Sequence, residues 1–158
     1  MPSRTPPTIL LVTGAFTTTH CYDALVPLLE QAEYPTAVAA PPSCDPKNPD
    51  EHTAQSDGRY LLEQHLLPLV NAGREVVVFA HSFGATALSG AAHHISRTER
   101  KEQGLAGGVI GLIYMSFALA PDGTSQIEYL GGKWPPFCKL NSVSNSNSPE
   151  TRLLPPTC

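Results

Sequence analysis

The sequence predicts an α/β fold with a mostly parallel central sheet, flanked by helices in three layers. Short runs of apolar and β-branched residues alternate with stretches of helical periodicity. Such alternation is typical of β-α-β units, whose right-handed crossovers make neighbouring strands parallel. The chain has 158 residues, of which 41% are hydrophobic and 15% charged, and this composition fits a single globular domain.

The apolar runs and the helical stretches predict seven elements in the order strand, helix, strand, helix, strand, helix, strand. They span residues 8–13, 21–31, 36–40, 53–71, 75–80, 83–100 and 109–115. In the first helix Leu25, Leu28 and Leu29 fall at the spacing of an apolar stripe, and Pro27 should lie near its first turn. Gly73 is placed to end the second helix.

The most informative segment is the run from Val76 to Ala85, in which a β-branched strand stops at Ser82 and an alanine-rich helix begins. Ala80 and Gly84 lie two residues before and two residues after the serine. This is the pattern of a nucleophile elbow, a sharp turn that exposes a serine hydroxyl and requires small neighbours. The alternative interpretation is a serine that caps the N-terminus of a helix.

With these motifs, residues 8 to about 138 resemble the N-terminal half of α/β-hydrolase fold proteins, in the esterase, lipase and hydroxynitrile-lyase-like branch. The matching blocks are residues 12–16 followed by 22–29, then residues 76–84, and then residues 108–115. Thr13-Gly14 stands where the family usually has His-Gly, and Ala80 where it usually has glycine.

The resemblance implies that Ser82 is the nucleophile and that the backbone N–H groups of Ala15 and Phe83 form the oxyanion hole. It further implies ester hydrolysis of a small or medium apolar substrate, without a cofactor. In the family the catalytic acid and histidine normally follow later in the chain. Here His20 is the candidate base, or else a polar residue at the pocket rim. Asp122 is the candidate acid, or else part of a Pro-Asp-Gly turn.

Because these partners are weak candidates, we expect a truncated hydrolase of low activity. The alternatives are a non-catalytic pseudo-hydrolase or interaction module, or an inert fragment of a longer hydrolase. A dehydrogenase is disfavoured, because Val12-Thr13-Gly14-Ala15 lacks the further glycines that a pyrophosphate loop needs.

Composition excludes several other classes of protein. The net charge of −4 gives no reason to expect nucleic acid or an anionic membrane as partner. No apolar run reaches the ~18 residues that span a bilayer, and the N-terminus lacks a signal-peptide core, so a cytoplasmic protein is expected. The four cysteines lack the spacing of a metal or disulfide framework and are predicted to be free thiols.

We expect a hydrolase-like domain over residues 1–138 and a disordered or loosely attached tail over residues 139–158, which is rich in Asn, Ser and Pro. The last predicted strand, residues 109–115, is apolar and lies at an open edge of the sheet. Open apolar edges pair readily with other strands, so self-association through this strand is expected.

Overall fold

The computed structural model describes residues 5–44, 52–115, 120–121, 123–133, 139–142 and 151–154. The chain divides into two units, Met1–Phe117 and Ala118–Cys158. All the strands and helices predicted from the sequence lie in the first unit.

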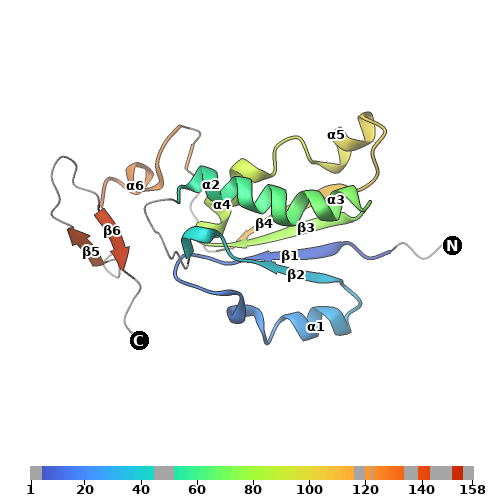
Figure 1. The fold of residues 1–158 in the computed structure, drawn as a ribbon, viewed down its shortest axis with the longest axis horizontal. Coiled ribbons are helices and arrows are strands. Elements are labelled where there is room, and N and C mark those ends of the chain that lie inside the picture. The colour runs from blue at the N-terminus through green and yellow to red at the C-terminus, as the bar shows by residue number, and fades with distance from the viewer. Residues whose placement is uncertain are drawn as a thin grey trace. The chain divides into compact units, whose positions relative to one another are not determined.

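The first unit is built on a four-stranded sheet of order β2-β1-β3-β4 (Figure 1). Its strands are β1 (Thr8–Val12), β2 (Thr36–Ala39), β3 (Glu75–His81) and β4 (Gly108–Met115). Every neighbouring pair is parallel, as the alternating pattern predicted. Since all four strands run the same way, their C-terminal ends meet at one edge of the sheet, where ligands bind in open α/β folds.

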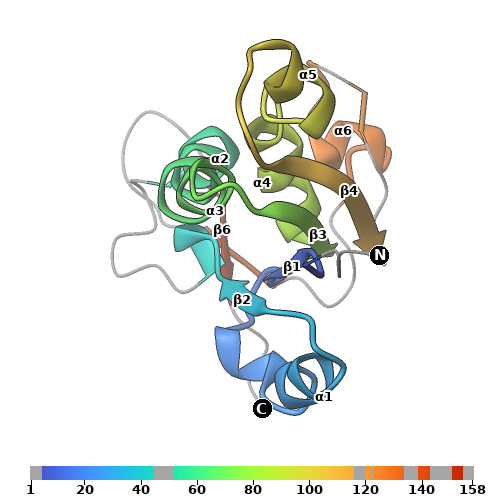
Figure 2. The same ribbon diagram turned by 90° about the vertical axis from the view of Figure 1, so that its right-hand side faces the viewer.

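The helical segments connect these strands. They are η1 (Thr19–Tyr22), α1 (Val26–Gln31), η2 (Pro42–Cys44), α2 (Ala54–Tyr60), η4 (Leu61–Leu66), α3 (Leu67–Asn71), α4 (Phe83–Ala91) and α5 (Arg97–Glu102). Helices α2, α3 and α4 lie on one side of the sheet and α1 on the other, which gives the three layers that were predicted (Figure 2).

The main core lies between the sheet and the α2–α4 side. In β3 every second residue is fully buried, namely Val76, Val78 and Ala80. They pack in one cluster with Leu10 of β1 and Leu88 of α4. The buried face of the strand, made by every second residue, therefore packs against the apolar face of the helix, as the sequence pattern indicated.

The opposite side of the sheet is much less covered. No residue of α1 is buried, and Leu28 is 61% exposed. The predicted apolar stripe of this helix is thus present but not buried, because α1 contacts the edge strand β2 rather than the centre of the sheet. Pro27 lies in the first turn of α1, as expected.

The predicted helix over residues 53–71 is one continuous helical stretch with a change of pitch. Thr53 and Ser56 form a capping box at its start. The middle, η4, is π-helical, and α3 begins just before Pro68. A π-helical turn commonly accommodates an interruption of the regular hydrogen-bond ladder, and Pro68, which has no N–H, supplies one.

The prediction of one helix over residues 83–100 is wrong. The structure ends α4 at Ala91 and begins α5 at Arg97. Between them His94 has a φ of 59°, and Ser96 caps α5 while forming a bridge to Val109 of β4. The sheet contact and the cap stop the helix, although its local sequence has helical periodicity.

The second unit contains α6 (Gln126–Tyr129), β5 (Lys139–Ser142) and β6 (Thr151–Leu154), of which the two strands form an antiparallel pair. These strands fall within the segment that was expected to be a tail, and the division at residue 138 stays a prediction. Among the described residues no helix combines the length and the apolar character needed to cross a bilayer.

Candidate active site at the strand–helix turn

Ser82 joins β3 to α4 in a strained backbone conformation. Its φ is 49° and its ψ is −123°, a combination that residues other than glycine rarely adopt and that costs about 1–3 kcal/mol. Although Ser82 holds the N-cap position of α4, its side chain makes no capping hydrogen bond. The simple capping interpretation therefore does not explain this serine.

Two glycines allow the turn to form. A Cβ on Gly84 would overlap the carbonyl oxygen of Thr13 and lie 3.0 Å from Cγ1 of Val12. A Cβ on Gly14 would lie 3.1 Å from Cβ of Ser82. The first glycine lets α4 pack against the end of β1, and the second lets the turn after β1 contact the serine directly.

That turn has a fixed shape. Thr17 donates two hydrogen bonds to the Gly14 carbonyl, one from its hydroxyl at 2.6 Å and one from its amide at 3.4 Å. Phe16 has a φ of 61°. The amides of Ala15 and Phe83 donate no hydrogen bond to another described residue. Their role as oxyanion donors stays a prediction, and Ala15 directly follows the glycine that contacts Ser82.

The structure pairs His20 with an acid but not with the serine. Nδ1 of His20 lies 3.2 Å from Oδ2 of Asp23, and both side chains are exposed. They line a cavity of about 450 Å³ together with Val26, Pro27 and Val38, and neither Ser82 nor an oxyanion candidate is among the lining residues. No hydrogen bond joins His20 to Ser82 within the described chain. The base therefore stays a prediction, and Asp122 lies outside the described residues.

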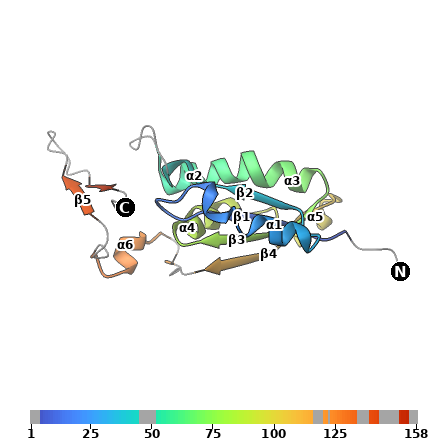
Figure 3. The ribbon, with the colours of Figure 1, turned by 90° about the horizontal axis from the view of Figure 1, so that it is seen from below.

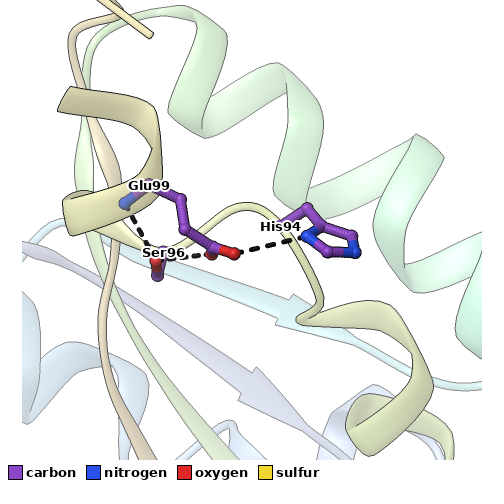
Figure 4. Close-up of polar contacts among 3 residues, drawn as sticks. All are labelled: His94, Ser96 and Glu99. Atoms are coloured by element: carbon purple, nitrogen blue, oxygen red, sulfur yellow. Dashed lines mark hydrogen bonds and ion pairs between the residues drawn. The ribbon is translucent and has the colours of Figure 1, made fainter. Parts of the chain in front are cut away.

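A second group of serine, histidine and acid occurs near α5 (Figure 4). The Ser96 hydroxyl donates to Glu99 at 2.6 Å, and Glu99 in turn lies 3.3 Å from Nδ1 of His94. These bonds, that from Ser96 first, lower the pKa of Glu99. The carboxylate stands between serine and histidine, whereas a catalytic triad needs the histidine in the middle. The group is therefore a helix cap.

The structure contains a buried polar pair, Asp57 and Ser43, that the sequence analysis did not identify. Asp57 of α2 is fully buried. Its carboxylate accepts hydrogen bonds from the amide of Ser43, at 3.2 Å, and from the Ser43 hydroxyl. These hydrogen bonds connect η2 to α2. A charged residue at a helix position surrounded by small residues (Asp57 next to Gly58) was the available signal.

Cys44 and Thr13 lie next to this pair. Burial raises the pKa of the Cys44 thiol to about 12; the Thr13 hydroxyl opposes the rise and the charge of Asp57 adds to it. The Thr13 hydroxyl is buried and forms no hydrogen bond of good geometry with a described residue. Of the cysteines in the described chain, Cys21 and Cys44 are free, as predicted. A thiol that stays protonated is a poor nucleophile, so Cys44 is not expected to act as one.

No group of three His, Cys, Asp or Glu side chains in the described residues could hold a metal ion. The candidate site in the described residues is a strained serine next to a tightly packed glycine turn, with Ala15 and Phe83 as the predicted amide donors.

No family model matches this chain. It is 26% identical over 129 residues to a protein of Phoma sp. named "Probable hydrolase R7", an alignment that covers 82% of this chain and 50% of that relative. A crystal structure of a polyneuridine aldehyde esterase mutant superposes with a TM-score of 0.68 at 21% identity, over 95% of this chain and 58% of the other. The chain thus spans about half the length of the curated relative it matches, and its fold is that of the α/β-hydrolases, of which it holds a part.

Proposed function

We propose that this chain belongs to a serine hydrolase that cleaves carboxylic esters of small or medium apolar acids or alcohols through Ser82. The observation that carries the proposal is the strained conformation of Ser82 between β3 and α4, with a side chain that caps nothing. Strain of this kind persists where the surroundings enforce it and is concentrated at functional sites. The names of the two similar proteins described above, a hydrolase and an esterase, agree with this chemistry.

In the proposed reaction Oγ of Ser82 attacks the ester carbonyl while a base accepts the hydroxyl proton. The amides of Ala15 and Phe83 donate to the oxyanion that develops. The alcohol leaves with the proton, and water then hydrolyses the acyl-serine. Within this chain His20 is the candidate base. Because Asp23 already hydrogen bonds to it, Asp23 rather than Asp122 would orient the imidazole.

The alternative is a non-catalytic pseudo-hydrolase or interaction module. One observation favours it: His20, the candidate base, hydrogen bonds to Asp23 and not to Ser82. Without its base and acid, a serine hydrolase retains only roughly 10³–10⁴-fold catalysis over water.

The test is the reaction of the folded chain with a fluorophosphonate, followed by intact-mass analysis. We expect one phosphonate per chain, lost in Ser82→Ala. Ser89→Ala is the matched control, because Ser89 lies on the same helix and its hydroxyl donates to the Ala85 carbonyl at 2.8 Å; it should label like the wild type. If His20 is the base, His20→Ala should slow labelling by about 10²–10⁴-fold.

Hydrolysis of p-nitrophenyl esters with a graded series of acyl chains then tests the substrate class. A folded chain that takes up no phosphonate would contradict the proposal for this chain and favour the non-catalytic alternative. Labelling that survives in Ser82→Ala would assign the activity to another residue.

A further inference from the structure

Asp57 of α2 is a buried carboxyl group that the proposed reaction does not use. Its exposed fraction is 0%, and no Lys, Arg or His in the described part of the chain forms an ion pair with it. Burying a carboxyl group costs free energy unless its oxygens accept hydrogen bonds. They accept from the amide of Ser43, at 3.2 Å, and from the Ser43 hydroxyl. The two bonds therefore compensate the burial and hold Ser43 against α2.

The next residue extends this contact to the end of β1. Cys44 directly follows Ser43 in η2 and is buried. The hydroxyl of Thr13 lies close enough to the Cys44 thiol to oppose the rise in the pKa of that thiol. Thr13 is fully buried and is the first residue after β1. A continuous line of contacts therefore runs from Asp57 of α2 to Thr13 at the end of β1.

Thr13 contacts a different element through each of its polar groups. Its amide donates to the Ala39 carbonyl of β2 at 3.0 Å. Its carbonyl oxygen is the atom that a Cβ on Gly84 of α4 would overlap. Its hydroxyl forms no hydrogen bond of good geometry with a described residue. The amide and the carbonyl are thus fixed by the sheet and by α4, whereas the side chain contacts Cys44 of η2.

The position of Thr13 bears on that of the predicted oxyanion donor. Gly14 follows it, and a Cβ on Gly14 would lie 3.1 Å from Cβ of Ser82. Ala15, whose amide is the predicted donor, comes next. Because peptide units are planar and each residue has only two soft dihedral angles, a displacement of Thr13 is passed on to the amide of Ala15. The distance between this amide and Ser82 therefore depends on how Thr13 packs.

The same turn of α2 also contacts the helix that follows Ser82. Gly58 is next to Asp57, and a Cβ on Gly58 would lie 2.8 Å from the carbonyl oxygen of Ala87 in α4. Helix α2 begins at the end of the sheet where the strands end (Figure 3). The backbone of α2 therefore packs directly on the helix after the candidate nucleophile, while Asp57 reaches the turn after β1 through η2.

We propose that Asp57 is a positioning residue, which sets the place of the Ala15 amide relative to Ser82 through η2. This role rests on the function proposed for Ser82. In it Asp57 transfers no proton and acts only through distance. Oxyanion donors must lie about 2.7–3.1 Å from the developing charge, and a displacement of about 1 Å can lower a rate by about 10²-fold. A role limited to the stability of η2 would leave the reactivity of Ser82 unchanged.

The first test compares two variants of Asp57 in the rate at which a fluorophosphonate labels Ser82. Alanine removes both acceptors. Asparagine preserves both bonds, because its carbonyl accepts from the Ser43 amide and its NH₂ group donates to the Ser43 hydroxyl, which is also an acceptor. Asp57→Ala should lower the second-order rate constant by about 10–10²-fold, and Asp57→Asn should label close to the wild-type rate. Asp57→Ala as fast as the wild type, or Asp57→Asn as slow as Asp57→Ala, would overturn the proposal.

A core variant separates positioning from stability. Leu66 is fully buried further along the same helical stretch, so Leu66→Ala destabilises the chain without removing a contact of Ser43. All rates are measured where circular dichroism shows the chain to be folded, and Leu66→Ala should then label like the wild type. If it labels as slowly as Asp57→Ala, the slowing is a general effect of lost stability and the positioning role fails. Ser43→Ala, which removes only the hydroxyl donor, takes the place of Asp57→Ala in each comparison if that variant does not fold.

A double-mutant cycle tests the route through η2. Cys44→Ala removes the thiol beside Thr13 and should itself slow labelling. Residues that act along one line of contacts have non-additive effects, so Asp57→Ala should slow labelling less in the Cys44→Ala background than in the wild type. Two losses that simply multiply would show that Asp57 does not act through Cys44 and would contradict the proposed role.

The last test does not depend on the reactivity of Ser82. In amide NMR spectra of the folded chain, Asp57→Ala should shift the signals of Gly14 and Ala15 and leave that of Gly104, in the turn after α5, unchanged. Shifts confined to η2 would rule the positioning role out. A wild type that takes up no phosphonate, while Gly14 and Ala15 shift in the variant, would contradict the proposed function and support the positioning of the turn by Asp57.

Discussion

The amide of Ser82 donates a hydrogen bond of 3.0 Å to the carbonyl of Met115. This bond continues the pairing with β4 one residue beyond the end of β3 at His81, and α4 begins at Phe83 directly after it. The sheet therefore fixes the backbone of the serine, while its hydroxyl makes no capping hydrogen bond to α4. The strain at Ser82 is maintained by contacts with β1 and β4 that lie far away in sequence.

Replacing Ser82 by glycine should relieve this strain. Glycine adopts a positive φ at no steric cost, whereas alanine at the same position keeps the strain. Relief of about 1–3 kcal/mol is partly offset by the flexibility of glycine in the unfolded chain, about 0.4–1 kcal/mol. The free energy of unfolding of Ser82→Gly should therefore exceed that of Ser82→Ala by about 1 kcal/mol in urea denaturation. Equal stabilities would mean that the turn is unstrained in solution.

Gly84→Ala should destabilise the chain, because its Cβ would overlap the carbonyl of Thr13. Overpacking of this kind costs about 1–3 kcal/mol. Gly90 lies on the same helix and is the matched control, since a Cβ there meets nothing within 4 Å. Gly90→Ala should stabilise by about 0.5–1 kcal/mol. Thermal unfolding of both variants would check this, and similar shifts for the two would contradict the close packing of α4 against β1.

Asp57→Ala should cost about 2–3 kcal/mol, because it leaves the amide and hydroxyl of Ser43 without their charged acceptor. The control is Glu63→Ala, at an exposed position of the same helical stretch, which should change stability by less than about 0.5 kcal/mol. Urea denaturation monitored by circular dichroism gives both values. If Asp57→Ala left the free energy of unfolding unchanged, the hydrogen bonds between Asp57 and Ser43 would not stabilise the position of η2.

Lowering the pH should reduce the free energy of unfolding, partly through protonation of His65. Burial lowers the pKa of His65 from its ordinary 6.5, and its Nε2 is buried without a partner among the described residues. Below pH 6.5 the unfolded chain binds a proton at His65 before the folded chain does, so stability falls as the pH decreases towards the lowered pKa. Above that window both states are neutral and this contribution is constant.

In His65→Phe that part of the acid dependence should disappear. The difference in unfolding free energy between the variant and the wild type should be constant between pH 7 and 8 and move in favour of the variant between pH 6.5 and 5. A difference that stays constant over the whole range would show that His65 titrates alike in both states.

The amino-acid sequence by itself determined the order of strands and helices, the parallel sheet and the location of the serine turn. These follow from local signals: the period of two in β3, the helical spacing after Ser82, and the small residues Ala80 and Gly84. Such features can be read in one segment at a time, since they depend on burial of one face of a single strand or helix.

The tertiary structure alone decided the features that depend on contacts between distant segments. It decided the positive φ of Ser82, the contact of Gly14 with that serine and the burial of Asp57 against Ser43. It also decided that the helix after the serine ends at Ala91, because Ser96 pairs with Val109 of β4. Local propensity favours a longer helix there, but the hydrogen bonds to a strand formed later in the chain stabilise the break.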